Sequence, residues 1–495
     1  MAKVKLGGRL WLRAALSCLL SVVAVPVLAA DQAERALAFV AELVARGEIR
    51  AGTTLRLAFK PGNINALLGA DLELQREWEE KTGTRISARV MPNQPTLANF
   101  ASYPDFDLTV GRPYEHQELL DKALIAPLDD LAARFGFAID DHGASGFIHP
   151  RLQATFGGRL LAIPADGDVT LLYLRHDLLD DPAEQKAYRA RTGRSLAIPR
   201  TWAEYDAQVR FFHRPDKEFY GAAEERDPEG GWMYWMQRYL PQQAPYQPLF
   251  DEQARPLIDS PAGVSATEHY VHSARHGPPQ ATEEGRDYSY VLPLFMQGKA
   301  YSAMTTIAGA KLFTSAGSSV LGRFSAIPMP GVMVDGRLVR RNMPIYGNNL
   351  MVAKASPNQA LAFLFAMWLT DPVVSLRTVG ARGGHTDPYR WHHLTDPRIE
   401  SIYTPAALSV FAREWDVAVP SGMGLIDESE YATVLDRQLW LAARGEITPA
   451  EAMKRTAREW ERLTERIGRD RQIASLQAFR AEMLRREPLP PGGGR

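Results

Sequence analysis

Two aspartates, Asp166 and Asp168, flank a glycine in the segment IPADGDV. Two carboxyl groups held close together can divide the roles of acid and base, as in the hydrolysis of a glycosidic bond. The distance between the groups in space decides whether they can do so, and spacing along the chain does not provide it. The same carboxylates could instead accept hydrogen bonds from the hydroxyl or amine groups of a bound solute.

Three histidines, His269, His272 and His276, recur at the spacing of one helix face. Such a set could ligate zinc. We favour a polar helix face, with His276 near the negative end of the helix dipole. We therefore expect no metal site and no cofactor.

Sequence motifs of common exported hydrolases and of nucleotide-binding proteins are absent. The chain has no G-x-S-x-G elbow, no H-E-x-x-H pair and no phosphate-binding loop. Nothing in the sequence demands an enzyme, and we expect a protein without catalytic residues.

The elements that would position these residues alternate between strands and helices. LRLAF reads as a strand that ends in the turn KPGNIN, and LELQREWEEKT reads as a helix that stops at Gly83. RISARV and FDLTV read as further strands, the latter followed by the loop GRPYEH. This alternation predicts an α/β fold with a largely parallel sheet, whose ligands lie at the carboxyl ends of the strands.

The aromatic stretch GGWMYWMQRYL, residues 230–240, carries apolar residues on one helix face. This spacing indicates core packing, which we expect for Trp235 and Tyr239. Trp232 follows two glycines at the start of the helix, where the backbone can approach a ligand. We expect Trp232 to face a binding cleft.

The carboxyl-terminal part of the chain is strongly helical. Thr448, Pro449 and Glu451 have the spacing of an N-cap, a first-turn proline and a capping-box partner. We expect a helix that starts after Thr448, and a loose tail over residues 486–495.

Residues 1–29 have the pattern of a secretory signal peptide, with a basic start, an apolar run and a small-residue exit. An uncleaved anchor helix is the alternative, because the run is nearly long enough to span a bilayer. Cleavage would remove the sole cysteine, Cys18, and would shift the formal net charge from −1 to −5. That mild acidity gives no reason to expect nucleic acid as a partner.

Six segments in chain order resemble the extracellular solute-binding proteins of family 1, which capture sugars for ABC importers. The segments are LELQREWEEKTGTRISARV, DFDLTVGRPYEHQELLDKALIAPLDDL, GGRLLAIPADGDVTLLYLRHDLL, PRTWAEYDA, LFMQGKAYSAMT with FSAIPMPG, and YGNNLMVAKASPNQALAFLFAMWLTDP. Together they cover most of residues 70–470. One departure is that no tryptophan follows TTIAGA, where the family has an aromatic platform at the cleft.

The resemblance implies a type II periplasmic binding protein fold, with two lobes and a ligand cleft and hinge between them. We expect lobe one to comprise residues 51–165 and 328–372, and lobe two to comprise residues 166–327 and 373–470. Hinge closure around a solute would produce a shape that the transporter can sense.

The resemblance also implies a set of ligand-binding residues at the mouths of the strands and at the crossings between lobes. Asn63 and Asn65 could equally be turn residues that bond to their own backbone. Asp168 matches a position where family members contact ligand hydroxyls, and a turn cap is the alternative for both aspartates. Trp232 could supply the missing platform. The full set is Asn63, Asn65, Arg112, Tyr114, Asp166, Asp168, Trp232, Thr306, Tyr346, Asn348 and Arg382.

We therefore expect a periplasmic, monomeric protein that captures a sugar or sugar-like solute and delivers it to an inner-membrane ABC permease. The first alternative keeps the fold and changes the ligand to a polyol, a polyamine or an organic acid. The second alternative is an exported glycoside hydrolase that uses Asp166 and Asp168.

Overall fold

The computed structural model describes residues 31–485, apart from residues 93–95, 104, 229 and 383. The predicted signal peptide, residues 1–29, and the predicted tail, residues 486–495, lie outside the described residues. Within the described part of the chain, no helix has both the length and the apolar character needed to cross a membrane.

The first sheet has the strand order β12-β3-β1-β2. β1 pairs in parallel with β2 and with β3, whereas β12 is antiparallel to β3. The predicted strands at LRLAF, RISARV and FDLTV are confirmed. The bounds are β1 Thr54–Phe59, β2 Arg85–Val90, β3 Leu108–Gly111 and β12 Asn349–Val352.

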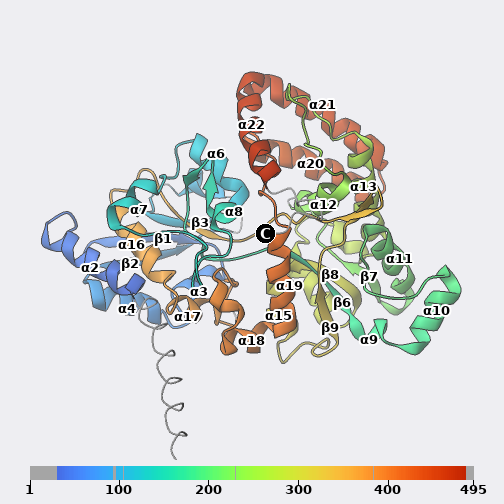
Figure 1. Cartoon of the computed structure of the whole chain (residues 1–495), viewed down its shortest axis with the longest axis horizontal. Helices are drawn as coiled ribbons and strands as arrows, with labels where there is room; N and C mark the ends of the chain where they lie inside the picture. The colour runs from blue at the N-terminus through green and yellow to red at the C-terminus, as the bar shows by residue number, and fades with distance from the viewer. Residues whose placement is uncertain (1–30, 93–95, 104, 229, 383, 486–495) are drawn as a thin grey trace, which may run out of the picture.

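Helices surround this sheet and form with it the first half of the molecule, on the left of Figure 1. The predicted helix end at Gly83 is confirmed, since Gly83 caps α4 with a φ of 67°. The helices are α2 Asp31–Ala45, α3 Asn63–Leu67, α4 Glu73–Thr82, α5 Thr96–Ser102, α6 His116–Asp121, α7 Asp129–Phe135, α8 Pro150–Ala154, α16 Gln359–Leu369 and α17 Ser375–Val379.

The amino-terminal helix α2 explains why α16 is apolar on all its faces. From Leu361 to Leu369 every residue of α16 is buried. α2 packs directly against α16, and the Gln32 side chain donates a hydrogen bond of 2.6 Å to the carbonyl of Met367. α2 is therefore part of the core of the first half.

The second sheet has the order β7-β8-β6-β9. The parallel pairing predicted from the strands of the first sheet does not extend to this sheet, because β6 is antiparallel to both β8 and β9, and only β7 and β8 are parallel. Strand direction depends on where the connecting chain enters the sheet, which local patterns do not encode. The bounds are β6 Thr170–Arg175, β7 Tyr220–Ala223, β8 Ala300–Thr306 and β9 Phe324–Ile327.

The helices around the second sheet and at the carboxyl terminus complete the second half. One of them, α21, starts as predicted: the Thr448 side chain accepts a hydrogen bond from the backbone N–H of Glu451. These helices are α9 His176–Leu179, α10 Pro182–Thr192, α11 Trp202–Phe212, α12 Gly231–Tyr239, α13 Pro261–Arg275, α14 Tyr288–Met296, α15 Ala308–Phe313, α18 Pro397–Tyr403, α19 Pro405–Asp416, α20 Glu428–Ala443, α21 Pro449–Ile467 and α22 Arg469–Arg485. In the described part of the chain, two small hairpins and five 3-10 turns connect the larger elements. The hairpins are β4 Thr155–Phe156 with β5 Arg159–Leu160, and β10 Val332–Val334 with β11 Arg337–Val339. The 3-10 turns are η1 Pro113–Glu115, η2 Pro215–Lys217, η3 Leu240–Gln242, η4 Pro279–Thr282 and η5 Trp391–Leu394.

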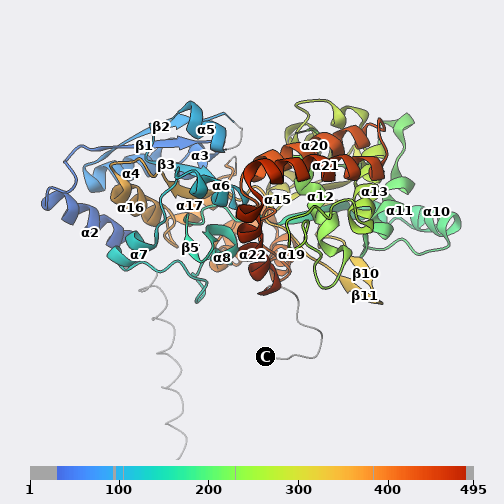
Figure 2. The same cartoon turned by 90° about the horizontal axis from the view of Figure 1, so that it is seen from above.

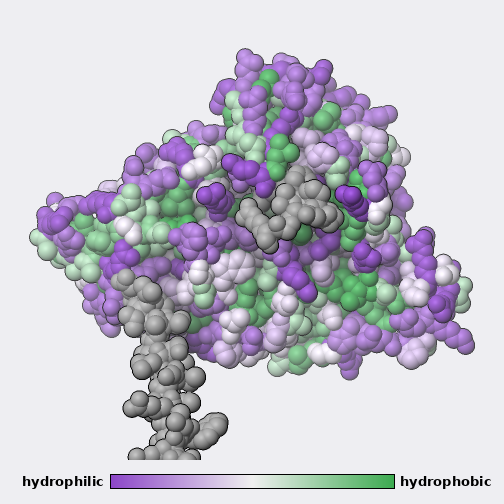
Figure 3. All heavy atoms as spheres, in the orientation of Figure 1, coloured by the Kyte–Doolittle hydropathy of each residue, from purple (hydrophilic) through white to green (hydrophobic). Residues whose placement is uncertain are grey.

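The two halves lie side by side, and α22 runs along the line where they meet (Figure 2). Hydrophilic residues cover most of the face seen in Figure 3, with apolar patches between them. The chain passes from the first sheet to the second before β6 and returns to the first sheet at β12.

The exact lobe boundaries stay a prediction, and two hydrogen bonds bear on them. Arg341, expected in lobe one, donates a hydrogen bond of 2.7 Å to the carbonyl of Leu240 in the second half. Arg390, expected in lobe two, donates one of 2.7 Å to the carbonyl of Thr370 in the first half. These contacts favour a later crossing in both places than the sequence suggested.

Candidate functional site

A cavity of about 830 Å³ lies between the two halves. Its lining includes Arg112 and Tyr114 of the first half, Trp232 of α12, and Tyr346 from the segment that leads into β12. Residues of the first turns of α20 also line it. A concave, mixed polar and aromatic space of this size is typical of sites for small solutes.

Four of the predicted site residues form one contact group in the cavity wall. The Arg112 guanidinium donates a hydrogen bond of 2.7 Å to the Tyr114 hydroxyl and lies 5.1 Å from the centre of the Tyr346 ring. The Tyr114 ring meets the Trp232 ring edge-to-face at 5.2 Å between centroids. Aromatic rings and a guanidinium are the groups that contact sugar ring faces and hydroxyls.

The helix α12 places Trp232 at this wall. Gly231 has no room for a side chain, because a Cβ there would lie 2.4 Å from the Tyr270 hydroxyl. The Trp232 backbone N–H donates a hydrogen bond of 2.5 Å to Asp436 of α20. Trp235 and Tyr239, as predicted, are core residues, with 0% and 2% of their surface exposed.

Acidic residues dominate the polar part of the lining, and sequence reasoning missed them. The carboxylate of Glu225 accepts hydrogen bonds of 2.8 Å from the Tyr346 hydroxyl and 3.2 Å from the Tyr234 hydroxyl. Burial, together with the nearby charges of Asp227 and Asp287, raises the pKa of Glu225 to about 7. No motif marks these residues, because they come from separate parts of the chain: Glu118 from α6, Glu428 and Asp436 from α20, and Glu225, Asp227 and Asp287 from irregular segments.

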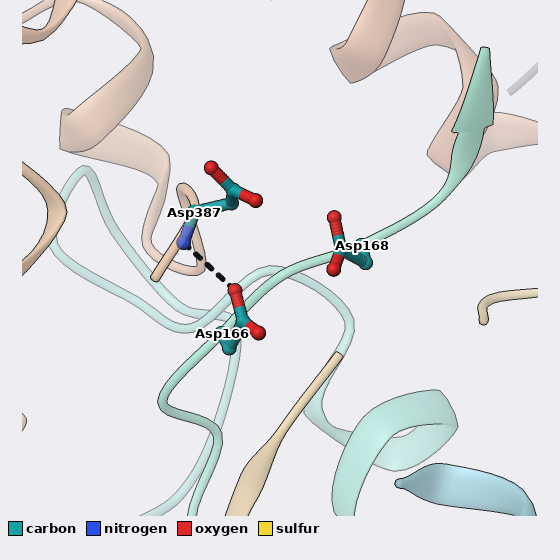
Figure 4. Close-up of side chains that lie close together, drawn as sticks. All are labelled: Asp166, Asp168 and Asp387. Carbon is teal, nitrogen blue, oxygen red and sulfur yellow. Dashed lines mark hydrogen bonds between the residues drawn. The ribbon is translucent and has the colours of Figure 1, made fainter. Parts of the chain in front are cut away.

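The remaining predicted residues at the first crossing form a separate cluster with Asp387. The carboxylates of Asp166, Asp168 and Asp387 gather around a common space (Figure 4), with one oxygen of each within 4.8 Å of the others. Asp166 accepts hydrogen bonds from the backbone N–H groups of Asp387, at 2.7 Å, and Asn348, at 3.1 Å. Thr306, at the end of β8, hydrogen-bonds to the Asp168 side chain.

Burial and mutual repulsion set the protonation of this cluster. Burial and the charge of Asp387 raise the pKa of Asp166 to about 7. Burial and the charges of Asp166 and Asp387 raise the pKa of Asp168 well above its usual value. None of the three carboxylates lines the cavity, so the structure does not present them to a glycoside as an acid and base pair.

The other three predicted residues also lie away from the cavity. Asn63 is buried, and its amide donates a hydrogen bond of 3.0 Å to the carbonyl of His385, which is a structural contact. Asn65 and Arg382 are exposed, and neither lines the cavity. Sequence reasoning placed Asn63 and Asn65 by the turn KPGNIN, but both lie in the short helix α3. It placed Arg382 by the loop after α17, and Arg382 does not line the cavity.

The histidines of α13 are packed against α11. The Nδ1 atom of His269 lies 2.6 Å from a carboxylate oxygen of Asp206, and the Nε2 atom of His272 lies 3.0 Å from the Asp206 carbonyl. These polar contacts agree with the predicted polar helix face.

Comparison with known proteins agrees with this architecture. The profile of a family described as bacterial extracellular solute-binding protein matches residues 99–374, which is more than half of the chain. No curated protein matches the chain in sequence.

Solved structures share the fold over most of the chain. An ABC transporter solute-binding protein from Agrobacterium radiobacter, in complex with ribitol, has 21% identity and a TM-score of 0.68, covering 83% of this chain and 99% of its own. Maltose-bound MalE3 of T. maritima has 18% identity and a TM-score of 0.66, covering 83% and 100%. A solute-binding protein from Agrobacterium vitis with bound D-mannitol has 19% identity and a TM-score of 0.65, covering 84% and 99%.

These similarities confirm the expected two-lobed α/β fold. Together with the matched profile, they lead to one conclusion: the chain belongs to the bacterial extracellular solute-binding protein family.

Proposed function

We propose that this protein is the substrate-binding component of an ABC importer and that it captures a sugar or polyol in the cavity between its halves. The observation that carries the proposal is the cavity of about 830 Å³, walled by aromatic rings and hydrogen-bonding side chains from both halves. Its fold relatives with bound ribitol, maltose and D-mannitol support this class of ligand.

The proposed mechanism is binding without chemical change. Closure of the halves would replace the hydrogen bonds between solute and water by bonds to fixed protein groups. The rings of Tyr114 and Trp232 would contact the apolar faces of the solute, and Arg112 would donate to its hydroxyls. The closed protein would then dock on an inner-membrane permease after export directed by residues 1–29.

A solute that carries an amino group is the second candidate, favoured by the charge of the lining. Arg112 and Arg437 are its basic residues, against a larger group of carboxylates: Glu115, Glu118, Glu225, Asp227, Glu284, Asp287, Glu428 and Asp436. An ammonium group near Glu225 would gain a charge-assisted hydrogen bond in a site shielded from water.

The test is a thermal-shift and calorimetric screen of the purified protein against sugars, polyols and their amino analogues, because a bound solute raises the Tm by mass action. Paired solutes such as glucose and glucosamine differ in the amino group alone. A Tm shift with sugars or polyols supports the first candidate, and a shift restricted to the amino analogues supports the second. No binding by any member of either class would contradict the proposal.

The Trp232→Ala variant locates the site. We expect its Kd for the bound solute to rise about tenfold or more, corresponding to a loss of roughly 1.4 kcal/mol of binding free energy. Trp391→Ala is the matched control, because Trp391 is a partly buried tryptophan that does not line the cavity. Equal Kd values for the two variants would place the solute elsewhere.

A further inference from the structure

The aspartate cluster joins two distant parts of the chain at the junction of the halves. Asp166 and Asp168 lie in the segment that enters β6, and Asp387 lies in the loop after α17. The two segments touch, because a Cβ on Gly167 would lie 2.1 Å from the carbonyl oxygen of Pro388. Asp166, Asp168 and Asp387 are all buried, with 3%, 4% and 2% of their surface exposed.

The charges of the cluster are only partly balanced by its surroundings. The Lys311 ammonium lies 3.5 Å from Asp387, but its closer hydrogen bonds go to the carbonyls of Gly384 at 3.0 Å and Thr386 at 2.9 Å. One ammonium against three carboxylates leaves two negative charges when all three are ionised. Buried charge of one sign is costly unless it is paired, protonated or bound to a metal.

One oxygen of the cluster has no partner at all among the described residues. The Oδ1 atom of Asp168 is buried without a hydrogen bond. The Oδ1 atom of Asn348, whose amide nitrogen lies 3.3 Å from Asp166, is also buried without one. Figure 4 shows the Asp168 carboxylate beside the space that the other two carboxylates border. An acceptor left bare in such a place needs an explanation, and an ion held by the cluster supplies one.

We propose that Asp166, Asp168 and Asp387 bind one divalent cation of the Ca²⁺ class, which ties the segment before β6 to the loop after α17. Ca²⁺ binds oxygen ligands at about 2.3–2.6 Å, so two oxygens on opposite sides of it are about 5 Å apart. The oxygens of the cluster lie within 4.8 Å of one another and satisfy this limit. The side chains proposed as ligands are carboxylates, which favour a hard cation over zinc or copper.

Calorimetric titration of the chelator-treated protein with CaCl₂, without any organic solute, tests the site separately from the proposed transport function. We expect one Ca²⁺ per chain and an increase in Tm. Asp168→Asn should weaken Ca²⁺ at least about tenfold, since even groups that only orient metal ligands are worth about 10–100-fold. Asp141→Asn, the same change at an exposed position, should bind Ca²⁺ like the wild type.

Two results would overturn the proposal: no Ca²⁺ binding by the wild type, or wild-type affinity in Asp168→Asn. If Asp168→Asn does not fold, Tb³⁺ luminescence of the wild type replaces it. The Tyr403 hydroxyl contacts Asp387, so a Tb³⁺ ion in the cluster should be excited through this ring. Excess Ca²⁺ should abolish that signal, and Tyr403→Phe should reduce it; a signal unaffected by either would place the ion elsewhere.

Discussion

At the scale of single residues, burial changes the pKa of a carboxyl group in the cavity wall. Glu225 is 4% exposed and lies near two other carboxylates, and its pKa is raised to about 7. A carboxyl group whose pKa is raised on folding binds a proton more tightly in the folded state. Its contribution to stability is therefore complete below about pH 4.5 and is lost as pH rises to about 7.

The variant Glu225→Gln should remove this pH dependence, because glutamine keeps an acceptor oxygen for Tyr346 and Tyr234 without the charge. The free energy of unfolding of the variant, relative to the wild type, should increase between about pH 5 and about pH 8 by on the order of 3 kcal/mol. Urea unfolding across this range measures it. The exposed Glu80→Gln is the control, and a difference between Glu225→Gln and wild type that stays constant with pH would refute the assignment.

At the scale of elements, a buried ion network holds α12 and therefore Trp232. Glu224, just after β7, accepts hydrogen bonds from Arg238 of α12 at 2.7 Å, from Arg226, and from Tyr205 at 2.6 Å. Burial alone would raise the pKa of Glu224, but the two guanidinium groups lower it to about 2. β7 and the helix that presents Trp232 are thus linked through Glu224, whose carboxylate is paired with two guanidinium groups.

Glu224→Gln should destabilise the protein by about 3–5 kcal/mol, because it leaves two buried guanidinium groups without a counter-charge. The loss should appear as a lower midpoint in chemical denaturation and a lower Tm. Glu184→Gln is the comparison, because its ion pair with Arg214 is partly exposed and should contribute about 1 kcal/mol or less. Equal losses of stability in the two variants would show that burial of the network does not increase its contribution to the free energy of unfolding.

At the scale of the whole molecule, the described structure has its halves in contact across the cavity. Lys122, just after α6, forms an ion pair of 2.6 Å with Asp427, just before α20, and the Ser429 hydroxyl donates to Glu118 at 2.9 Å. Gln117 also hydrogen-bonds to Ser475 of α22. These few polar contacts are weak on their own, and an enclosed solute would add the free energy that favours closure.

Small-angle scattering should therefore show a smaller radius of gyration with bound solute than without it. The halves would separate when these contacts open, and the solute would shift the population to the closed form. Lys122→Ala, which removes one contact outside the cavity, should raise the Kd by about fivefold at most. A radius of gyration unchanged by a saturating solute would show that closure does not accompany binding.

Several features of this protein follow from its sequence alone, because they depend on contacts between near neighbours. The end of α4 at Gly83, the start of α21 after Thr448 and the burial of Trp235 and Tyr239 all rest on residues within two turns of one another. The collinear motifs identified the family. Arg112, Tyr114, Trp232 and Tyr346 were also placed in one site, although their role in binding stays a prediction.

Tertiary structure alone decided which of these residues meet. The backbone N–H of Asp387 and the carboxylate of Asp166 are 221 residues apart in the chain and 2.7 Å apart in space. The same holds for the antiparallel strands of the second sheet and for the acidic wall around Glu225. Such neighbours depend on how helices and sheets pack over the whole chain, and no local pattern of residues carries that information.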